Sequence, residues 1–492
     1  MTGIPKLRDP SLLKEACFVG GEWVTEGEDG TLSVRNPSNG QTVARVPRMG
    51  GSATRRAIAQ AQEALPAWRS ATAQERASVL RRWQALMIEN QEDLATIMTA
   101  EQGKPLAESR GEISYAASFL EWFAEEAKRA YGDVVPATSR DRRILVLKQP
   151  VGVCAAITPW NFPAAMITRK AGPALAAGCT MVVKPASQTP MSALALAALA
   201  ERAGVPKGVL SVVVGASDAI GQELTSSPIV KKLSFTGSTE IGKVLLEQCA
   251  RTIKRTSMEL GGNAPFIVFD DADLDSAVAG AIASKYRNAG QTCICVNRIL
   301  VQSIIYDEFV TRFSAAVRNL QVGDGFSAGV TLGPLIDDQA LNKVQEHIQD
   351  ATSKGAKIAA GGRRHQLGRT FFEPTVISEA APDMLIFNEE TFGPVAPIFR
   401  FDTEDEAIAL ANNTEFGLAA YFYGRDMGRV WRVAEALEYG MVGINEAMIS
   451  TEVAPFGGMK QSGHGREGSR YGINEYLDIK YLCMGGLGDG AR

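Results

Sequence analysis

Short apolar runs alternate with helical segments from Val151 onward, and this alternation restricts the fold of the chain more than any other feature. Strands this short, each followed by a helix, predict a doubly wound parallel sheet. A second series of the same kind starts at Ala264, so we expect an α/β protein with two lobes that meet near residue 259. The predicted strands are 151–157, 180–184, 210–214, 232–235, 264–269 and 298–302. The predicted helices are 163–177, 192–203, 219–224, 237–249, 277–287, 306–318 and 341–354.

Other parts of the chain lie outside this alternation. Residues 17–50 have the pattern of short strands and turns. Residues 52–131 have helical periodicity, with aromatic side chains such as Tyr115 that we assign to the core. Two isolated strand-like runs, 144–149 and 475–483, are expected to pair between subunits. The chain is thus expected to carry a small β arm in addition to its two lobes.

The overall composition argues against several classes of protein. A chain of 492 residues exceeds what one core usually serves, so two or three domains are expected. The net charge of −4 argues against a nucleic-acid or acidic-lipid partner. The weakly polar stretch 164–183 contains Arg169 and Lys170, so no membrane span is predicted, and residues 1–20 show no signal-peptide pattern. Seven scattered cysteines favour a reducing cytoplasm, and the lack of CxxC pairs argues against a zinc site.

The segment Asn288–Cys295, which joins a predicted helix to a predicted strand, contains the strongest candidate for chemistry. A thiol is a good nucleophile only as the thiolate, so Cys293 needs a nearby base or a positive environment. A buried structural cysteine is the alternative interpretation. Histidine is the usual partner of a catalytic thiol, but the three histidines of the chain lie outside the candidate connectors. A carboxylate is therefore the expected base, and Glu259 lies beside glycines that let the backbone approach a ligand.

Three connectors at the expected carboxyl edge of the first sheet carry further candidates. Asn161 either stabilises an oxyanion through its amide or caps the helix that follows it. Lys184 either reaches a ribose or phosphate or is solvated at the strand end. Residues 237–242 begin a helix whose free N–H groups favour a phosphate, although they lack the first glycine of GxGxxG. From the residues alone, each of these alternatives stays open.

Six motifs taken together resemble the aldehyde dehydrogenase superfamily, in family order and over nearly the whole chain. They are Thr158–Pro163, Phe235–Thr239, Glu259–Asn263, Asn288–Cys293, Glu389–Pro394 and Pro455–Lys460. Three further segments resemble succinate-semialdehyde dehydrogenases within that superfamily, namely Met166–Lys170, Lys285–Asn288 and Ile449–Thr451. The fold implied by the resemblance has two doubly wound lobes and a small β oligomerisation arm. The implied divisions are a Rossmann-type dinucleotide domain at 1–126 and 148–258, a catalytic domain at 259–463, and the arm at 127–147 and 464–492.

The resemblance also implies a role for each matching position. Cys293 would attack the aldehyde, Asn161 and the Cys293 backbone N–H would hold the oxyanion, and Glu259 would activate the hydrolytic water. The residues implied for NAD(P) are Thr158, Pro159, Trp160, Lys184, Ser187, Gly221, Phe235, Gly237, Ser238, Leu260, Glu390 and Phe392. The residues implied for the substrate are Arg169, Arg287, Ser450, Phe162 and Phe456, with the two arginines gripping a carboxylate. The implied assembly is a homodimer or homotetramer.

Two positions bear on cofactor choice and regulation. NAD-preferring members of the superfamily often have a glutamate three residues after the position of Lys184, where it would repel a 2′-phosphate. Ser187 occupies that position here, so we expect NADP to be accepted at least as well as NAD. Cys295 gives the chain a Cys-x-Cys pair of the kind that some semialdehyde dehydrogenases use as a redox switch, and a spectator thiol is the alternative.

The predicted function is NAD(P)-dependent oxidation of succinate semialdehyde to succinate. Glutarate semialdehyde is the alternative substrate for the same chemistry. A non-redox cysteine acyltransferase or thioesterase is the alternative from another class, and it would need no dinucleotide site. A non-catalytic binding protein on the same fold is a third interpretation, against which the joint presence of Cys293, Glu259 and Asn161 argues.

Overall fold

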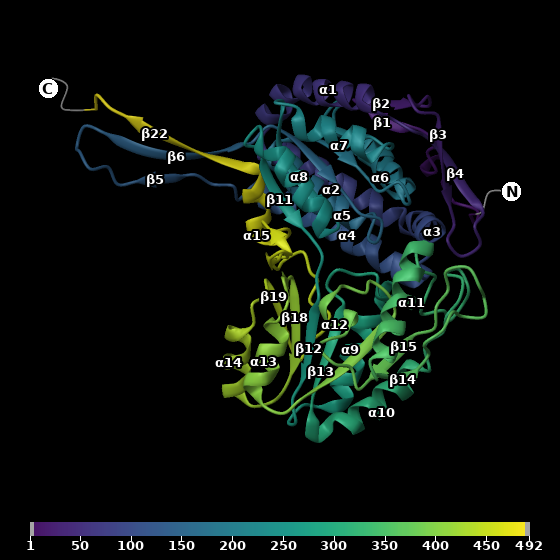
Figure 1. Ribbon diagram of the computed structural model, residues 1–492. Coiled ribbons are helices and arrows are strands. Elements are labelled where there is room, and N and C mark those ends of the chain that lie inside the picture. Colours follow the sequence, from purple (N-terminus) through teal and green to yellow (C-terminus); the bar gives the residue numbers. More distant parts are fainter. Residues whose placement is uncertain (1–3, 488–492) are drawn as a thin grey trace.

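The computed structural model describes residues 4–487 and contains two large sheets, one above the other in Figure 1. The first sheet has the strand order β2-β1-β9-β8-β7-β10-β11-β21. Strands β9 to β11 in that order are parallel, and β1, β2 and β21 are antiparallel to their neighbours. The strands are β1 (Cys17–Val19), β2 (Glu22–Val24), β7 (Val153–Ile157), β8 (Thr180–Lys184), β9 (Leu210–Val212), β10 (Val230–Thr236), β11 (Arg255–Glu259) and β21 (Gly463–His464). The direction of winding reverses between β7 and β10, so the sheet is doubly wound.

Helices cover both faces of this sheet. Its central strand β8 is buried along its whole length, as expected of a parallel strand covered on both faces. On one side α1 contacts α7 and α7 contacts α8, whereas α4 contacts α2 and α5 on the other. The helices are α1 (Gly51–Ser70), α2 (Ala73–Glu89), α3 (Gln91–Gln102), α4 (Leu106–Ala127), α5 (Ala165–Ala177), α6 (Pro190–Arg202), α7 (Ser217–Ser226) and α8 (Thr239–Ala250).

Local sequence signals divide the predicted helical region 52–131 into α1 to α4. The Thr72 side chain accepts from the Glu75 backbone N–H in a capping box that begins α2. Gly103 ends α3 with a φ of 94°, a left-handed conformation that glycine adopts without steric cost. Pro105 then precedes the first residue of α4. The short connector between α3 and α4 therefore turns sharply and carries Lys104 into the interior.

The second sheet has the strand order β14-β15-β16-β13-β12-β18-β19, with every pair parallel except β14 and β15. Its strands are β12 (Ala264–Val268), β13 (Val296–Gln302), β14 (Lys357–Ala360), β15 (Thr375–Ser378), β16 (Val395–Phe401), β18 (Ala419–Tyr423) and β19 (Met441–Ile444). Its helices are α9 (Leu274–Tyr286), α10 (Tyr306–Val317), α11 (Asp338–Ser353), α12 (Leu385–Asn388), α13 (Glu404–Asn412) and α14 (Met427–Ala436). Short pieces complete the chain: β3 (Thr31–Arg35), β4 (Thr42–Pro47), β17 (Phe416–Gly417), β20 (Met459–Lys460) and α15 (Ser469–Gly472).

A three-stranded sheet extends away from the rest of the molecule (Figure 1). Strand β6 (Arg143–Pro150) lies between β5 (Asp133–Val135) and β22 (Leu477–Met484) and is antiparallel to both. The runs 144–149 and 475–483 pair with each other within one chain, and their contact with another subunit stays a prediction. Sequence patterns can indicate which segments form strands, but they do not show which distant strand each one pairs with.

The predicted α/β class with doubly wound sheets is confirmed. Element boundaries shift by a few residues where caps were not recognised: α8 begins after Ser238, whose side chain accepts from the Ile241 N–H. The proposed domain boundaries stay a prediction, and residues 1–3 and 488–492 of those domains lie outside the described residues. Between residues 4 and 487, no helix is long and apolar enough to cross a membrane.

Candidate active site

A cavity of about 880 Å³ lies at the carboxyl ends of the parallel strands where the winding of the first sheet reverses. Connectors after β7, β8 and β10 form its wall, so segments far apart in sequence meet there. Among its lining residues are nine of the positions expected to hold a dinucleotide: Thr158, Pro159, Trp160, Lys184, Ser187, Gly221, Phe235, Gly237 and Ser238. An open parallel sheet generally binds ligands at this place.

A second cavity, of about 240 Å³, shares Pro159, Trp160 and Gly237 with the first and continues toward the second sheet. It brings together the three residues expected to carry catalysis, Asn161, Glu259 and Cys293. The remaining predicted dinucleotide residues, Leu260, Glu390 and Phe392, also line it.

A third and much narrower cavity, of about 10 Å³, lies on the other side of Cys293. It contains all five predicted substrate residues: Phe162, Arg169, Arg287, Ser450 and Phe456. Tyr115 lines it as well. Cys293 is the lining residue that this narrow cavity shares with the second one. The thiol therefore lies between the dinucleotide side and a tunnel that contains two guanidinium groups.

The loop that carries Cys293 has an unusual backbone. Asn288 and Ala289 have φ values of 50° and 54°, and Gly290 has a φ of 77°. A side chain at Gly290 would also lie 2.1 Å from the Gly393 carbonyl oxygen, so only glycine fits there. Such strain is stored where the surrounding structure fixes the backbone, often at functional sites.

The environment of Cys293 disfavours the thiolate. Burial, and next the nearby Glu390 carboxylate, raise the pKa of the Cys293 thiol to about 12, while Arg169 opposes the shift. The side chain is nevertheless half-buried and open to both cavities, unlike an inert core cysteine. A base near the thiol is thus needed for nucleophilic attack at neutral pH.

Glu259 ends β11 and is a buried carboxyl group. Among the described residues, neither of its carboxyl oxygens has a hydrogen-bond partner. Burial, and next the charge of Glu467, raise its pKa well above 4.5, against the effect of Arg169 and Lys170. A carboxyl group with a raised pKa and open lone pairs can act as a proton acceptor near neutral pH.

Glu467, whose charge raises the pKa of Glu259, forms ion pairs with two buried cations. The Lys170 ammonium donates to the Glu467 carboxylate and, at 2.7 Å, to the Thr236 hydroxyl. One Arg169 nitrogen lies 2.8 Å from the other Glu467 oxygen, but the two atoms are not aligned as a hydrogen bond. Arg169 is therefore partly neutralised before any substrate arrives, which the sequence did not indicate.

Arg287, unlike Arg169, is not paired with a neighbouring carboxylate in the described part of the chain. Its guanidinium stands 4.8 Å from the Phe162 ring centre, and within residues 4–487 it has no ion pair. Arg169 stands 3.9 Å from the Phe456 ring centre. Each predicted apolar tunnel residue thus supports one arginine, and Arg287 is the more available cation.

The alternative interpretation of Asn161 as a helix cap is wrong. Helix α5 begins at Ala165, and its cap position is Ala164, with no side-chain capping bond. The Asn161 amide nitrogen instead donates to the Gln291 carbonyl at 3.1 Å, which directs it toward the cysteine loop. Lys184 is not solvated either: it is buried, and burial lowers its pKa to about 8.

Cys295, at the end of the same loop, is buried and lines neither of the two cavities that Cys293 lines. Its thiol donates to the Gly290 carbonyl at 3.2 Å and lies 3.8 Å from the Lys285 ammonium. Both Cys293 and Cys295 are free thiols in this structure. A disulfide between them would require the Cys295 contacts to break.

Sequence reasoning missed several residues around the site. Tyr115 was assigned to the core, yet it lines the tunnel. Lys104 and Glu112 lie in the region of helical periodicity, and nothing in the sequence shows that their charges are buried and paired. Arg48 shares a small cavity of about 210 Å³ with Ser187. The described residues contain no cluster of three or more potential metal ligands.

Comparisons with known proteins agree with this arrangement. The model of the aldehyde dehydrogenase family matches residues 23–482. The chain is 65% identical to a glutarate-semialdehyde dehydrogenase of Pseudomonas aeruginosa, over 98% of this chain and 100% of that protein. It is 63% identical to the succinate-semialdehyde dehydrogenase [NADP(+)] of Escherichia coli, over 98% and 100%. A solved succinate-semialdehyde dehydrogenase from Burkholderia pseudomallei superposes with a TM-score of 0.97 at 63% identity, covering 98% of this chain and 100% of that one. The chain therefore belongs to the aldehyde dehydrogenase family.

Proposed function

We propose that the protein oxidises an aldehyde with a carboxylate at its far end, succinate semialdehyde in the first place, with NADP or NAD as the hydride acceptor. The observation that carries this proposal is the position of Cys293, which lines both the dinucleotide-side cavity and the arginine-containing tunnel. The named activities of the relatives from Escherichia coli and Pseudomonas aeruginosa support the same substrate class and, in the first case, NADP.

The residues present fit a nicotinamide dinucleotide. Lys184 is a buried cation whose ammonium bonds a single backbone carbonyl, that of Pro185, so further hydrogen-bond donors are open toward the cavity. The first turn of α8 presents N–H groups beside Gly237 and Ser238, which favours a phosphate group. Glu390 and Phe392 line the part of the cavity nearest Cys293, where they would hold the nicotinamide ribose and ring.

The chemistry assigned to the chain has two stages. Cys293, once deprotonated, adds to the aldehyde carbon, and the amide nitrogen of Asn161 with the Cys293 backbone N–H holds the resulting oxyanion. The nicotinamide that Glu390 and Phe392 would hold in this cavity would supply the hydride acceptor, and Cys293 would keep the acyl group as a thioester. Glu259 then takes a proton from a water molecule that attacks the thioester, which releases the carboxylic acid and the thiol.

The tunnel residues would select the substrate. Arg287 and Arg169, with the hydroxyl of Ser450, would bind the far carboxylate, and Phe162 and Phe456 would pack on the methylene chain. Glutarate semialdehyde is one methylene longer, and a single methylene is worth only about 1–3 kcal/mol of discrimination. Both substrates are therefore compatible with the same tunnel.

The decisive experiment compares succinate semialdehyde, glutarate semialdehyde and butanal, each with NADP and with NAD. Wild-type protein should give the highest kcat/KM with one of the two semialdehydes. Cys293→Ala should abolish turnover, and Glu259→Gln should release a burst of reduced cofactor and then stall. Steady turnover in either variant, or equal kcat/KM for butanal, would contradict the proposal.

A non-redox cysteine acyltransferase or thioesterase is the remaining alternative. It predicts thioester hydrolysis without any saturable binding of NADP or NAD, which fluorescence titration of the pure protein measures directly.

We also propose a homodimer or homotetramer assembled through the β5–β6–β22 arm, and a cytoplasmic location. The exposed apolar side chains of the arm support the assembly.

A further inference from the structure

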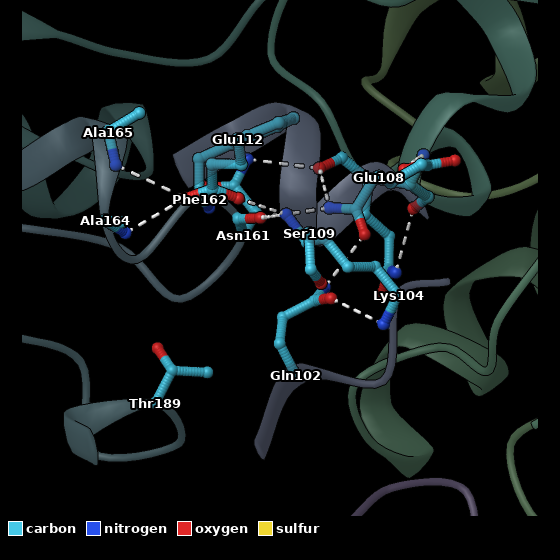
Figure 2. Close-up of polar contacts among 12 residues, drawn as sticks. Gln102, Lys104, Glu108, Ser109, Glu112, Asn161, Phe162, Ala164, Ala165 and Thr189 are labelled. Carbon is cyan, nitrogen blue, oxygen red and sulfur yellow. Dashed lines mark hydrogen bonds and ion pairs between the residues drawn. The ribbon is translucent and has the colours of Figure 1, made fainter. Parts of the chain in front are cut away.

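A buried ion pair lies behind the connector that carries Asn161, residues 158–164, and lines none of the cavities described above. Lys104 and Glu112 are each about 1% exposed at their side chains. The Lys104 ammonium donates to Glu112 at 2.5 Å and to the backbone carbonyl of Asn161 at 2.7 Å (Figure 2). The same ammonium stands 4.1 Å from the centre of the Phe162 ring. Burying two charges is costly unless each is fully paired, so this arrangement requires an explanation.

Glu112 holds the other end of the same connector. Its second carboxylate oxygen accepts from the backbone N–H groups of Ala164 at 2.9 Å and Ala165 at 3.3 Å, at the start of α5. One ion pair therefore grips the connector at the Asn161 carbonyl and again at the beginning of the helix (Figure 2). Residues between these two points have little freedom to move.

The cysteine loop is tied to the same point. Asn288 donates through its side-chain amide to the Asn161 carbonyl at 3.1 Å. The Asn288 side-chain oxygen accepts from Gln102 at 2.9 Å, and Gln102 in turn accepts from the Lys104 backbone N–H at 2.8 Å. The α3–α4 connector thus contacts both the segment that carries the oxyanion amide and the segment that carries the thiol.

We propose that Lys104, paired with Glu112, is a positioning residue that fixes Asn161 relative to Cys293; this inference rests on the proposed function. Lys104 holds the main chain of Asn161 from behind, so the amide nitrogen of that residue points at the cysteine loop. Misplacement of a catalytic group by about 1 Å can reduce the rate about 10²-fold. Lys104→Met should therefore slow acylation by about 10- to 100-fold, while dissociation constants for NADP change less than about twofold.

A double-mutant cycle separates positioning from other effects. The acylation rate, measured as the pre-steady-state burst of reduced cofactor, is determined for Lys104→Met, Asn161→Ala and the double variant. If Lys104 acts through Asn161, the double variant is no slower than Asn161→Ala alone. Losses that multiply would overturn the proposal, because Lys104 would then act elsewhere.

Stability requires its own comparison, because Lys104→Met leaves the Glu112 charge buried and unpaired. In Lys104→Met/Glu112→Gln both charges are gone, and the Tm should recover toward that of wild type while acylation stays slow. Recovery of both the Tm and the acylation rate would show a purely structural pair and would overturn the proposal. Arg110→Met is the matched control, since Arg110 lies on the same helix in a half-exposed pair with Glu92 and should leave acylation unchanged.

These experiments separate a failure of the positioning role of Lys104 from a failure of the proposed function. If wild-type protein gives no burst with any aldehyde, the oxidation itself is wrong, and the positioning role falls with it. If wild-type protein gives a burst and the cycle is additive, only the role of Lys104 is wrong.

Discussion

At the residue scale, the buried carboxyl group of Glu259, which has no hydrogen-bond partner among the described residues, should lower the free energy of unfolding at neutral pH. Its pKa is raised above 4.5, chiefly by burial. Between pH 4.5 and that raised value, the folded protein keeps a proton that the unfolded chain has lost, so the free energy of unfolding falls as pH increases. Glutamine cannot ionise, and Glu259→Gln should therefore have a Tm above wild type at neutral pH and an equal Tm below about pH 4. Thermal unfolding at both pH values checks this; a less stable variant at neutral pH would contradict it.

The two thiols of the cysteine loop give a second residue-scale prediction. Peroxide should inactivate the protein, and dithiothreitol should restore its activity. The mass of the oxidised peptide that contains Cys293 and Cys295 should be lower by the two thiol hydrogens. Cys295→Ser is the control and should be inactivated irreversibly, because Cys293 then has no neighbouring thiol. A sulfinic or sulfonic adduct on Cys293 in wild-type protein, without a disulfide, would show that no switch exists.

At the scale of elements, the connector after β8 should decide between the two dinucleotides. Ser187 lines the main cavity and, with Arg48, the small cavity beside it. Ser187→Glu should shift preference toward NAD by repelling the 2′-phosphate, and Arg48→Ala should weaken NADP without affecting NAD. Ratios of kcat/KM for the two cofactors measure this. A wild-type preference for NAD above about tenfold, or ~1.4 kcal/mol, would show that other contacts dominate.

The tunnel between the two sheets gives unequal roles to its arginines. Arg287→Ala should lower kcat/KM for succinate semialdehyde by roughly 30- to 1000-fold (2–4 kcal/mol) and for butanal far less, because butanal makes no carboxylate contact. Arg169 also lies against Glu467 beside Glu259, so Arg169→Ala should lower kcat/KM for both substrates. Equal losses on both substrates for Arg287→Ala would mean that Arg287 supports the fold.

At the scale of the whole molecule, the arm presents an apolar surface. Ile479 and Tyr481 on β22 are 74% and 61% exposed, and Val134 on β5 is 78% exposed. A surface of this kind on an extended sheet is typical of an interface. Ile479→Lys should shift sedimentation toward smaller species, whereas Ile304→Lys, at a position 80% exposed outside the arm, should not. An unchanged assembly in Ile479→Lys would place the interface elsewhere.

Local sequence patterns were sufficient for the first sheet, because β7, β8 and β10 are apolar runs separated by helices of ordinary length. The convergence of Asn161, Glu259 and Cys293 was predicted from the family motifs and not from spacing. Pairing of β6 with β22 could not be predicted, since it depends on register across more than three hundred residues. The same holds for Tyr115, whose role depends on which side of α4 faces the tunnel. It holds also for the Lys104–Glu112 pair, which depends on how the α3–α4 connector packs in the interior.

The carboxyl groups of Glu259 and Glu390, which line the cavity beside Cys293, have a consequence for the release of product. The aldehyde end of the substrate is neutral when it arrives, but the same end leaves as a carboxylate, formed in a cavity that Glu259 and Glu390 also line. Once Glu259 has passed on its proton, like charges face each other in a poorly hydrated space. The attraction that we propose between the arginines and the far carboxylate is then opposed by repulsion at the near end. The site should hold its product less tightly than its substrate, so accumulated acid would inhibit only weakly.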